Sequence, residues 1–239
     1  MGRMMRKHRA SKRAKSSERA WIKWLRLAGL MVLSWYVCCG LVLVLLRFAA
    51  PITTTVHIQR RVESWFGKGK YQKRSEFVAL HRIAPDLRHA VIAAEDGRFY
   101  DHQGVDFEEM KKVYEDSVER GKRLRGGSTI SQQLVKNLFL TTHRSPVRKA
   151  LEYALVPLAE LILPKERILE LYLNIIEWGP GVYGAQAAAK YHYGASAARL
   201  SREQAARLAA VIPDPLRRRP SRMNEYSAEI QRRMARMGW

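Results

Sequence analysis

Cysteine is nearly absent from this sequence of 239 residues. Its two cysteines, Cys38 and Cys39, are adjacent and lie inside one apolar run. The rest of the chain therefore offers no disulfide, no thiol nucleophile and no cysteine-based metal site. The seven histidines are scattered and form no HExxH pair, so the sequence predicts no dedicated metal site.

Acidic residues are almost missing from residues 1–26, where Glu18 stands alone against ten lysines and arginines. The formal net charge of the whole chain is +21. A charge of this size is typical of proteins that meet nucleic acid, a membrane surface or polyphosphate. The segment that follows favours the membrane.

Charged residues are also missing from residues 27–46, LAGLMVLSWYVCCGLVLVLL. About 20 apolar residues in a helix span the ~30 Å hydrocarbon core of a bilayer. Trp21 and Trp24 precede the run, as expected at a membrane interface. The alternative is a cleaved signal peptide with a weak cleavage pair at residues 49–50, but the apolar region of a signal peptide is only ~7–15 residues long. The run predicts an uncleaved transmembrane helix.

The position of the basic residues predicts the orientation, because cytoplasmic flanks of transmembrane helices are rich in lysine and arginine. The chain beyond Arg47 would then be exported, where a basic domain meets lipid head groups and lipid-linked phosphates rather than nucleic acid. Aromatic and basic residues are interleaved after the run, as at a lipid interface or in an ordinary linker with core aromatics. The predicted organisation is a basic cytoplasmic arm (1–26), a transmembrane helix (27–46), a membrane-proximal linker or jaw segment (47–84), a main domain (85–220) and a C-terminal tail (221–239).

The stretch VIAAEDGRFYDHQGVDF brings two adjacent carboxylates to the end of an apolar helical pattern. The pattern covers residues 87–94 at helical spacing and runs directly into Glu95 and Asp96. If the helix continued for another turn, Glu95, Phe99 and His102 would share one face. This stretch alone leaves two interpretations open, a functional carboxylate or a solvated helix end with a chance acidic pair.

The stretch GGSTISQQLVKN, residues 126–137, predicts a glycine-rich loop that opens a helix. Thr129 and Gln132 fit a capping box, and Thr129, Gln133 and Lys136 share a polar face. Free N–H groups at a helix N-terminus attract anions. We therefore favour an anion cradle over the alternative, a capped surface helix.

The stretch RKALE places Arg148 and Lys149 four and three residues before Glu152. On a helix this spacing brings both cations to the carboxylate, and an ordinary helical ion pair of ~0.2–0.5 kcal/mol is the better interpretation of this stretch alone. The next stretch, KERILELYLN, predicts an amphipathic helix that ends near Asn174 and serves as scaffold.

EDGRFYDHQG, GGSTISQQLVKN, RKALE and KERILELYLN occur in this order and resemble the first four signature motifs of the family 51 peptidoglycan glycosyltransferases. The stretch PDPLRRRP resembles the fifth, so the resemblance covers about residues 91–220. Ser131 stands where the family usually has threonine and retains the hydroxyl. No Ser-x-x-Lys is present, which excludes a fused penicillin-binding transpeptidase and favours a monofunctional member.

The resemblance implies a mainly α, lysozyme-like, two-lobed glycosyltransferase domain behind one N-terminal transmembrane helix. It implies polymerisation of lipid II, in which an acceptor GlcNAc hydroxyl attacks C1 of the donor MurNAc, C1 inverts, and undecaprenyl diphosphate leaves. Glu95 would be the general base, and Glu152 would assist at the diphosphate. The substrate-binding positions that it implies are Asp96, Phe99, His102, Ser128, Thr129, Gln132, Gln133, Lys136, Asn137, Arg148 and Lys149.

The resemblance implies no required cofactor, although Mg²⁺ or Mn²⁺ could sit on the substrate diphosphate. The expected partners are lipid II, the growing glycan strand, membrane phospholipid, other cell-wall synthases and division proteins, with no nucleic acid. The expected location is the bacterial inner (cytoplasmic) membrane, with a single pass, a cytoplasmic N-terminus and a periplasmic catalytic domain.

Two other classes of function compete with this one. A muramidase or lytic transglycosylase could use a similar carboxylate pair, but a lyase or hydrolase has no diphosphate for GGSTISQQLVKN to hold. A non-catalytic scaffold of the cell-wall machinery would not need both Glu95 and Glu152.

The predicted orientation is tested by a reporter that works only in the cytoplasm, fused after Trp239. The basic arm should keep the N-terminus in the cytoplasm and place the fused reporter outside, so the reporter should be inactive. Strong reporter activity would reverse the orientation.

Overall fold

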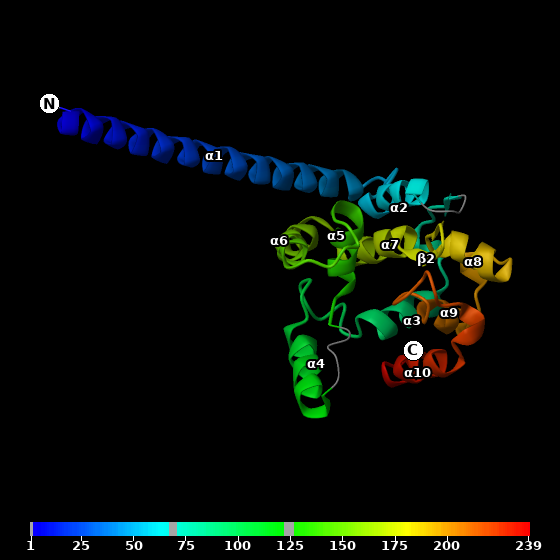
Figure 1. The fold of residues 1–239 in the computed structure, drawn as a ribbon. Helices are drawn as coiled ribbons and strands as arrows, with labels where there is room; N and C mark the ends of the chain where they lie inside the picture. The colour runs from blue at the N-terminus through cyan, green and yellow to red at the C-terminus, as the bar shows by residue number, and fades with distance from the viewer. Residues whose placement is uncertain (1, 67–70, 122–126) are drawn as a thin grey trace. The chain divides into compact units, whose positions relative to one another are not determined.

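A computed structural model describes residues 2–66, 71–121 and 127–239 of the chain. It is mainly α-helical, which confirms the predicted fold class (Figure 1). The chain divides into two compact units, one that ends at Val42 and one that covers Leu43–Trp239.

The first helix, α1 (Gly2–Leu46), contains the apolar run. Its segment Trp21–Leu46 has a mean hydropathy of 2.4 and is long enough to cross a membrane. Large apolar side chains such as Leu30, Met31 and Leu41 are exposed along it. An apolar surface of this extent is unusual in contact with water. The helix is therefore consistent with the predicted membrane anchor.

The second unit contains nine further α-helices, three 3₁₀ turns and one small sheet within the described residues. The strand order of the sheet is β1-β3-β2, with β1 parallel and β2 antiparallel to β3. Strands of two or three residues are too short to produce an alternating pattern in the sequence. The elements are α2 (Thr55–Phe66), β1 (Arg74–Ser75), η1 (Leu80–Arg82), α3 (Pro85–Glu95), α4 (Phe107–Arg120), α5 (Ile130–Phe139), α6 (Pro146–Ile162), α7 (Lys165–Ile175), β2 (Glu177–Gly179), β3 (Val182–Tyr183), α8 (Ala185–Tyr193), η2 (Ala197–Arg199), α9 (Arg202–Ala209), η3 (Pro220–Arg222) and α10 (Asn224–Arg236).

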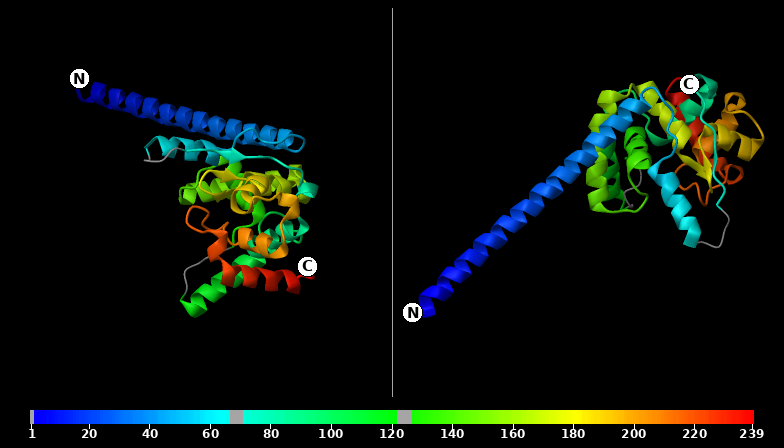
Figure 2. Two further views of the ribbon diagram at one scale, coloured as in Figure 1. Left: turned by 90° about the vertical axis from the view of Figure 1, so that its right-hand side faces the viewer. Right: turned by 90° about the horizontal axis from the view of Figure 1, so that it is seen from above.

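The helices of this unit form two packed groups. In one, α5 packs against α2, α6 and α7, and in the other, α3, α9 and α10 pack together. Figure 1 shows these groups one above the other, and Figure 2 shows α10 against the neighbouring helices from two more sides. The arrangement agrees with the predicted two-lobed architecture.

Local sequence explains where α3 and α5 begin and end. α3 has Pro85 in its first turn and buries Leu87 and Val91. It stops at Glu95, because Asp96 leaves the helical conformation. α5 begins with the predicted capping box, which the structure confirms: Thr129 and Gln132 each accept the other's backbone N–H.

The end of α3 corrects one expectation. Phe99 and His102 lie in the turns that follow the helix, so they do not continue the helical face of Glu95. The chain turns away from the helix axis at Asp96, whose side chain accepts hydrogen bonds from His102 and from the N–H of Ile130.

The C-terminal residues 221–239, predicted as a tail, are part of the packed unit. They include α10, which packs against α3 and α9 and completely buries Ile230 and Met234. The boundary predicted at residue 220 therefore does not mark the end of the fold. Most residues of α10 are polar or charged, so the sequence pattern did not reveal its narrow apolar face.

A glycine holds the junction between β3 and α8, and replacing it should destabilise the fold. Gly184 has φ +84°, and a Cβ there would lie 2.6 Å from the carbonyl oxygen of Asn174. Gly184→Ala should lower the free energy of unfolding by ~3 kcal/mol or more, because backbone strain adds to a clash with main-chain atoms.

The matched control is Gly194→Ala, at φ +62° with no heavy atom within 4 Å of the added Cβ. It should cost only ~1–2 kcal/mol, the cost of the left-handed conformation alone. Chemical denaturation of both variants measures the difference. Equal losses would show that the contact with Asn174 relaxes.

Candidate active site

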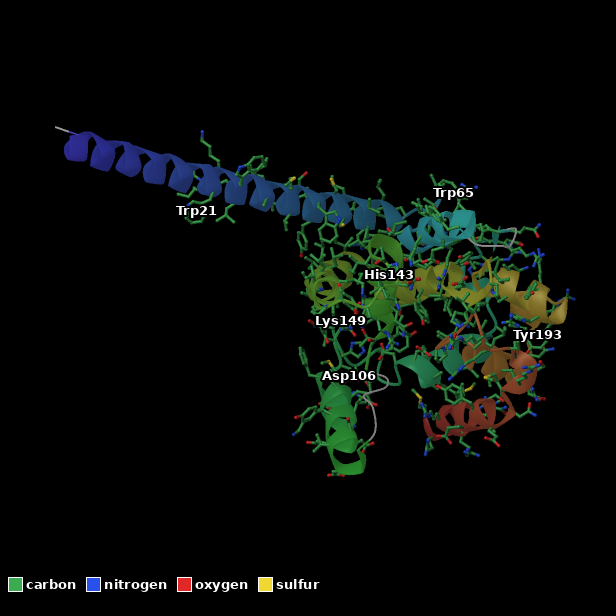
Figure 3. All side chains as sticks on the ribbon, in the orientation of Figure 1. Trp21, Trp65, Asp106, His143, Lys149 and Tyr193 are labelled. Carbon is green, nitrogen blue, oxygen red and sulfur yellow. The ribbon has the colours of Figure 1, made fainter. Side chains whose placement is uncertain are left out.

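A groove of about 1070 Å³ lies in the second unit. Its walls come from the end of α3, the start of α4, the start of α5 and the C-terminal segment. Two residues of this region are labelled in Figure 3: Asp106 at the start of α4 and Lys149 on α6. The residues that line the groove are Ala93, Ala94, Glu95, Asp96, Gly97, Arg98, Asp106, Glu109, Lys112, Val113, Gly127, Ser128, Thr129, Gln133, Lys136, Ile212, Pro213, Arg218, Tyr226, Arg233, Arg236 and Met237.

Glu95 is the last residue of α3 and faces this groove. Its Oε2 accepts a hydrogen bond of 2.7 Å from Nε2 of Gln133 on α5. Burial raises the pKa of Glu95, whereas this hydrogen bond and the charge of Lys136 act in the opposite direction. A carboxylate with a raised pKa that remains ionisable suits a general base that works near neutral pH.

A second hydrogen bond fixes the amide that contacts Glu95. Tyr172, on α7, is fully buried, and its hydroxyl donates to Oε1 of Gln133 over 2.9 Å. With Oε1 accepting from Tyr172, Gln133 must present its NH₂ group to Glu95. Sequence reasoning missed Tyr172, because its helix was assigned to the scaffold and no pattern within the helix marks the hydroxyl.

Asp96 connects the end of α3 to the start of α5. Its Oδ1 accepts from Nε2 of His102 over 2.8 Å, and its Oδ2 accepts from the backbone N–H of Ile130 over 2.9 Å. Nδ1 of His102 accepts from the N–H of Gly104, so the ring proton is on Nε2. Asp96 and His102 thus hold the loop in place, and this internal bonding leaves them little capacity for substrate.

Two N–H groups at the N-terminus of α5, those of Ile130 and Gln132, are bound by the protein itself and are not available to the predicted anion cradle. Asp96 binds the N–H of Ile130, and the Thr129 hydroxyl accepts from the N–H of Gln132 over 3.2 Å. The same hydroxyl donates to the carbonyl oxygen of Gly104 over 2.6 Å. Thr129 and Gln132 are therefore structural caps. An anion in the groove would have to rely on side-chain cations instead of these backbone groups.

Phe99 and Asn137 also make internal contacts rather than open ones. Phe99 is fully buried, with Nζ of Lys165 at 4.6 Å from its ring centre. Asn137 donates to the carbonyl oxygen of Gln133, one turn earlier on α5. Their predicted role in binding substrate gains no support from these contacts.

Glu152 lies at the centre of a cluster of cations on α6. It is buried, accepts from Nη1 of Arg148 over 2.6 Å, and pairs with Nζ of Lys149. Lys149 also contacts Oγ of Ser128, a groove residue, over 3.3 Å. The ion pairs offset the burial of the Glu152 charge, and Lys149 connects the cluster to the groove.

Lys136, on α5, lines the same groove as Glu95. Burial lowers the pKa of Lys136, and the charges of Glu152 and Glu95 act against that shift. Both carboxylates thus favour the charged form of Lys136. Glu95 and Lys136 line the groove together, whereas Glu152 is connected to it through Lys149 and Ser128.

One cluster in the described residues has the composition of a metal site. The potential ligand atoms of Asp96, His102 and Asp106 lie within 4.8 Å of one another. Each of these residues already has partners within the protein. Asp96 and His102 are bonded to each other, and His102 also accepts from the N–H of Gly104. Asp106 accepts from the N–H of Glu109 and pairs with Nε of Arg98 over 3.2 Å. A divalent ion would have to replace these bonds, so the cluster fits a loop-holding network better than a metal site.

Comparison with known proteins identifies the class of enzyme that this fold and groove represent. The family model described as Transglycosylase matches residues 61–237. The chain belongs to the transglycosylase family. The match extends through α10, in agreement with the packing of that helix.

The curated relatives are more specific. The biosynthetic peptidoglycan transglycosylase of Pseudomonas putida (strain F1) is 44% identical over 211 residues, covering 86% of this chain and 89% of that protein. The proteins of the same name from Stutzerimonas stutzeri and Nitrosospira multiformis are 44% identical over 219 residues (90% and 89% covered) and 47% identical over 164 residues (68% and 71% covered), respectively. The predicted family, and with it the prediction of an enzyme of glycan polymerisation, are confirmed.

The two hydrogen bonds that link Tyr172 to Gln133 and Gln133 to Glu95 predict a positioning role for Tyr172. Tyr172→Phe removes the donor to Gln133, which frees the amide to rotate and weakens its bond to Glu95. The rate of glycan polymerisation should fall roughly tenfold, in line with about 1.4 kcal/mol from one misplaced hydrogen bond. The acid limb of the pH–rate profile should also move to higher pH. The hydrogen bond from Gln133 lowers the pKa of Glu95, so the loss of this bond should raise that pKa.

A purely structural role for Tyr172 would change the melting temperature but leave the pH profile unmoved. Tyr193→Phe, at a hydroxyl with no partner among the described residues, is the control. It should leave both the rate and the profile unchanged.

Proposed function

We propose that this chain polymerises lipid II, with Glu95 as the general base. The observation that carries the proposal is the position of Glu95, which lines the groove together with Lys136 and is held by Gln133. Its Oε2 accepts the Gln133 amide, and Oε1 has no hydrogen bond within the described part of the chain. Oε1 is therefore the oxygen that would receive a proton from substrate.

The proposed step forms one bond and breaks one. The acceptor hydroxyl loses its proton to Glu95 as its oxygen bonds to C1 of the donor sugar. The bond from C1 to the diphosphate oxygen breaks on the opposite side, its electron pair leaves with the diphosphate, and C1 inverts. A base near the hydroxyl and cations near the leaving group are the two groups that such a step requires.

The cations for the leaving group are Lys136, Arg148 and Lys149. Together with Glu152 they carry a net positive charge, which matches the two to three negative charges of a diphosphate. The N–H groups of Ile130 and Gln132 are engaged internally, so these side chains would provide most of the positive charge. We propose that Glu152 acts through these cations, since its ion pairs hold Arg148 and Lys149 in place.

We further propose that the groove faces the periplasm and that the membrane holds the lipid part of the substrate. The basic arm before the apolar segment of α1 supports this orientation. At the end of α2, Trp65 and Phe66 are 74% and 88% exposed, and Figure 3 shows Trp65 on the outer side of this helix. Exposed aromatic residues of this kind suit the interface of a bilayer.

Glu95→Gln tests the proposed base. An amide keeps the shape of the side chain but accepts no proton, so polymerisation of labelled lipid II should fall by ~10²-fold or more. Because burial raises the pKa of Glu95, folding disfavours its charged form. The variant should therefore be at least as stable as the wild type at neutral pH, as measured by thermal denaturation.

The pH dependence gives an independent result. Glu95 must be ionised to accept a proton, so kcat/KM should fall as the pH drops through its raised pKa, above the ~4.3 of an ordinary glutamate. A Glu95→Gln variant that polymerises at the wild-type rate, or an acid limb at the ordinary value, would rule out Glu95 as the base.

A further inference from the structure

An arginine of α7 binds the carbonyl groups at the end of α1. A helix leaves its last carbonyl oxygens without partners inside the helix, and the last turn of α1, residues 43–46 (LVLL), offers no cation for them. Nε of Arg167 donates to the carbonyl oxygen of Leu46 over 2.8 Å, and its Nη2 donates to that of Ala49 over 2.6 Å. Arg167 therefore caps the C-terminus of the predicted membrane anchor.

A second arginine makes the reverse contact. Arg47 directly follows α1, and its Nη1 donates to the carbonyl oxygen of Ile162, the last residue of α6, over 2.9 Å. Leu43 and Leu46, in the last turn of α1, are buried and belong to the second unit. The last turn of α1 is therefore packed into the second unit rather than joined to it by a free linker.

Arg167 is itself held in place by two partners. Its Nη1 pairs with Glu170, three residues later on α7, and its guanidinium lies 5.6 Å from the ring centre of Phe77. Glu170 in turn accepts from the N–H of Leu80 over 2.7 Å. Arginine suits this position, because its planar fork of donors can bind several oxygens at once.

Asn174 holds the same membrane-proximal segment. Its side-chain amide accepts from the N–H of Val78 over 2.8 Å and donates to the carbonyl oxygen of Val78 over 2.9 Å. Asn174 lies seven residues after Arg167, on the same face of α7. The motif KERILELYLN, predicted as scaffold, thus binds two separate parts of the chain: the end of α1 and the segment before α3.

The same helix supports the proposed base. Tyr172, also on α7, donates to Gln133, which donates to Glu95. α7 therefore connects the end of the membrane helix to the groove. A lipid-linked substrate lies in the same bilayer as the anchor, so the two can engage only if the groove lies at the matching distance from the bilayer surface.

We propose that Arg167 is a positioning residue that fixes the distance between the groove and the bilayer surface. It holds the end of α1 and the turn that follows against α7. Phe48 and Ile52, just beyond α1, are 81% and 97% exposed, and apolar side chains exposed to this extent suit contact with lipid. The inference rests on the proposed function and adds to it the residue that brings the groove to the level of its substrate.

The competing explanation is that Arg167 only stabilises the fold. Arg202, on α9, makes the same kinds of bond: it pairs with Asp86 over 3.3 Å and donates to the main-chain oxygen of Trp239 over 2.6 Å. These bonds join α9 to α3 and to the C-terminal residue, not to the end of α1. Arg202→Ala is therefore the matched control, because it removes similar bonds and leaves the hold on the anchor intact.

The experiment measures polymerisation of lipid II by the full-length chain in proteoliposomes and in detergent micelles. A bilayer holds the substrate diphosphate at a fixed level, whereas a micelle adapts its shape to the protein. Arg167→Ala should lower the rate roughly tenfold in proteoliposomes, because two charge-assisted hydrogen bonds to the anchor are lost, and by no more than about twofold in detergent. Arg202→Ala should change neither rate by more than about twofold.

A purely structural role gives a different pattern. An equal loss in both media, or an unchanged rate in proteoliposomes, would overturn the proposal. If Arg167→Ala fails to fold, Arg167→Lys replaces it. Lysine keeps the charge but lacks the fork, so the rate should fall by a smaller factor, about threefold, in proteoliposomes alone. A wild-type rate of Arg167→Lys in proteoliposomes would likewise overturn the proposal.

Failure of the proposed function would look different, because the wild-type chain would then form no polymer in either medium. Energy transfer tests the positioning without turnover. A donor dye is attached through Ser221→Cys, at an exposed position, in a full-length chain that carries Cys38→Ala and Cys39→Ala, and acceptor dyes are attached to lipid head groups. Arg167→Ala should change the transfer efficiency, whereas Arg202→Ala should retain the wild-type value. The same efficiency in all three chains would overturn the positioning role.

Discussion

The carboxylate of Asp96 is the contact on which the rest of the site depends. It ends α3, accepts from His102 in the following loop, and caps α5 through the N–H of Ile130. Because Glu95 directly precedes Asp96, this capping fixes the base next to the first turns of α5. Gln133 and Lys136 lie on that same helix. One side chain therefore sets the distance between the base, its hydrogen-bond donor and the nearest cation.

Burial and charge oppose each other at the centre of the groove, and both are needed. Burial raises the pKa of Glu95 and lowers that of Lys136, so each group alone would tend toward its neutral form. The charge of each group favours the ionised form of the other and so opposes the effect of burial. A base that is too well solvated would have an ordinary pKa, and an unopposed buried one would be protonated and inactive.

Several motif residues serve the scaffold rather than the ligand, for a physical reason. A catalytic loop must hold its shape without substrate. Polar groups such as Asp96, His102 and Thr129 therefore form internal hydrogen bonds. The motifs indicated which residues gather at the site. They did not separate those that hold it from those that face the groove, because both kinds of residue occur within a few positions of each other.

The sequence by itself determined the features that depend on neighbours within about four residues. These include the apolar run of α1, the capping box at Thr129, and the spacing that pairs Arg148 and Lys149 with Glu152. Only the tertiary structure decided which distant partners meet. The bond from Ile130 to Asp96 spans 34 positions and that from Tyr172 to Gln133 spans 39, and α10 reaches the groove from the far end of the chain. Such contacts follow from how whole helices pack, and no local periodicity encodes the packing.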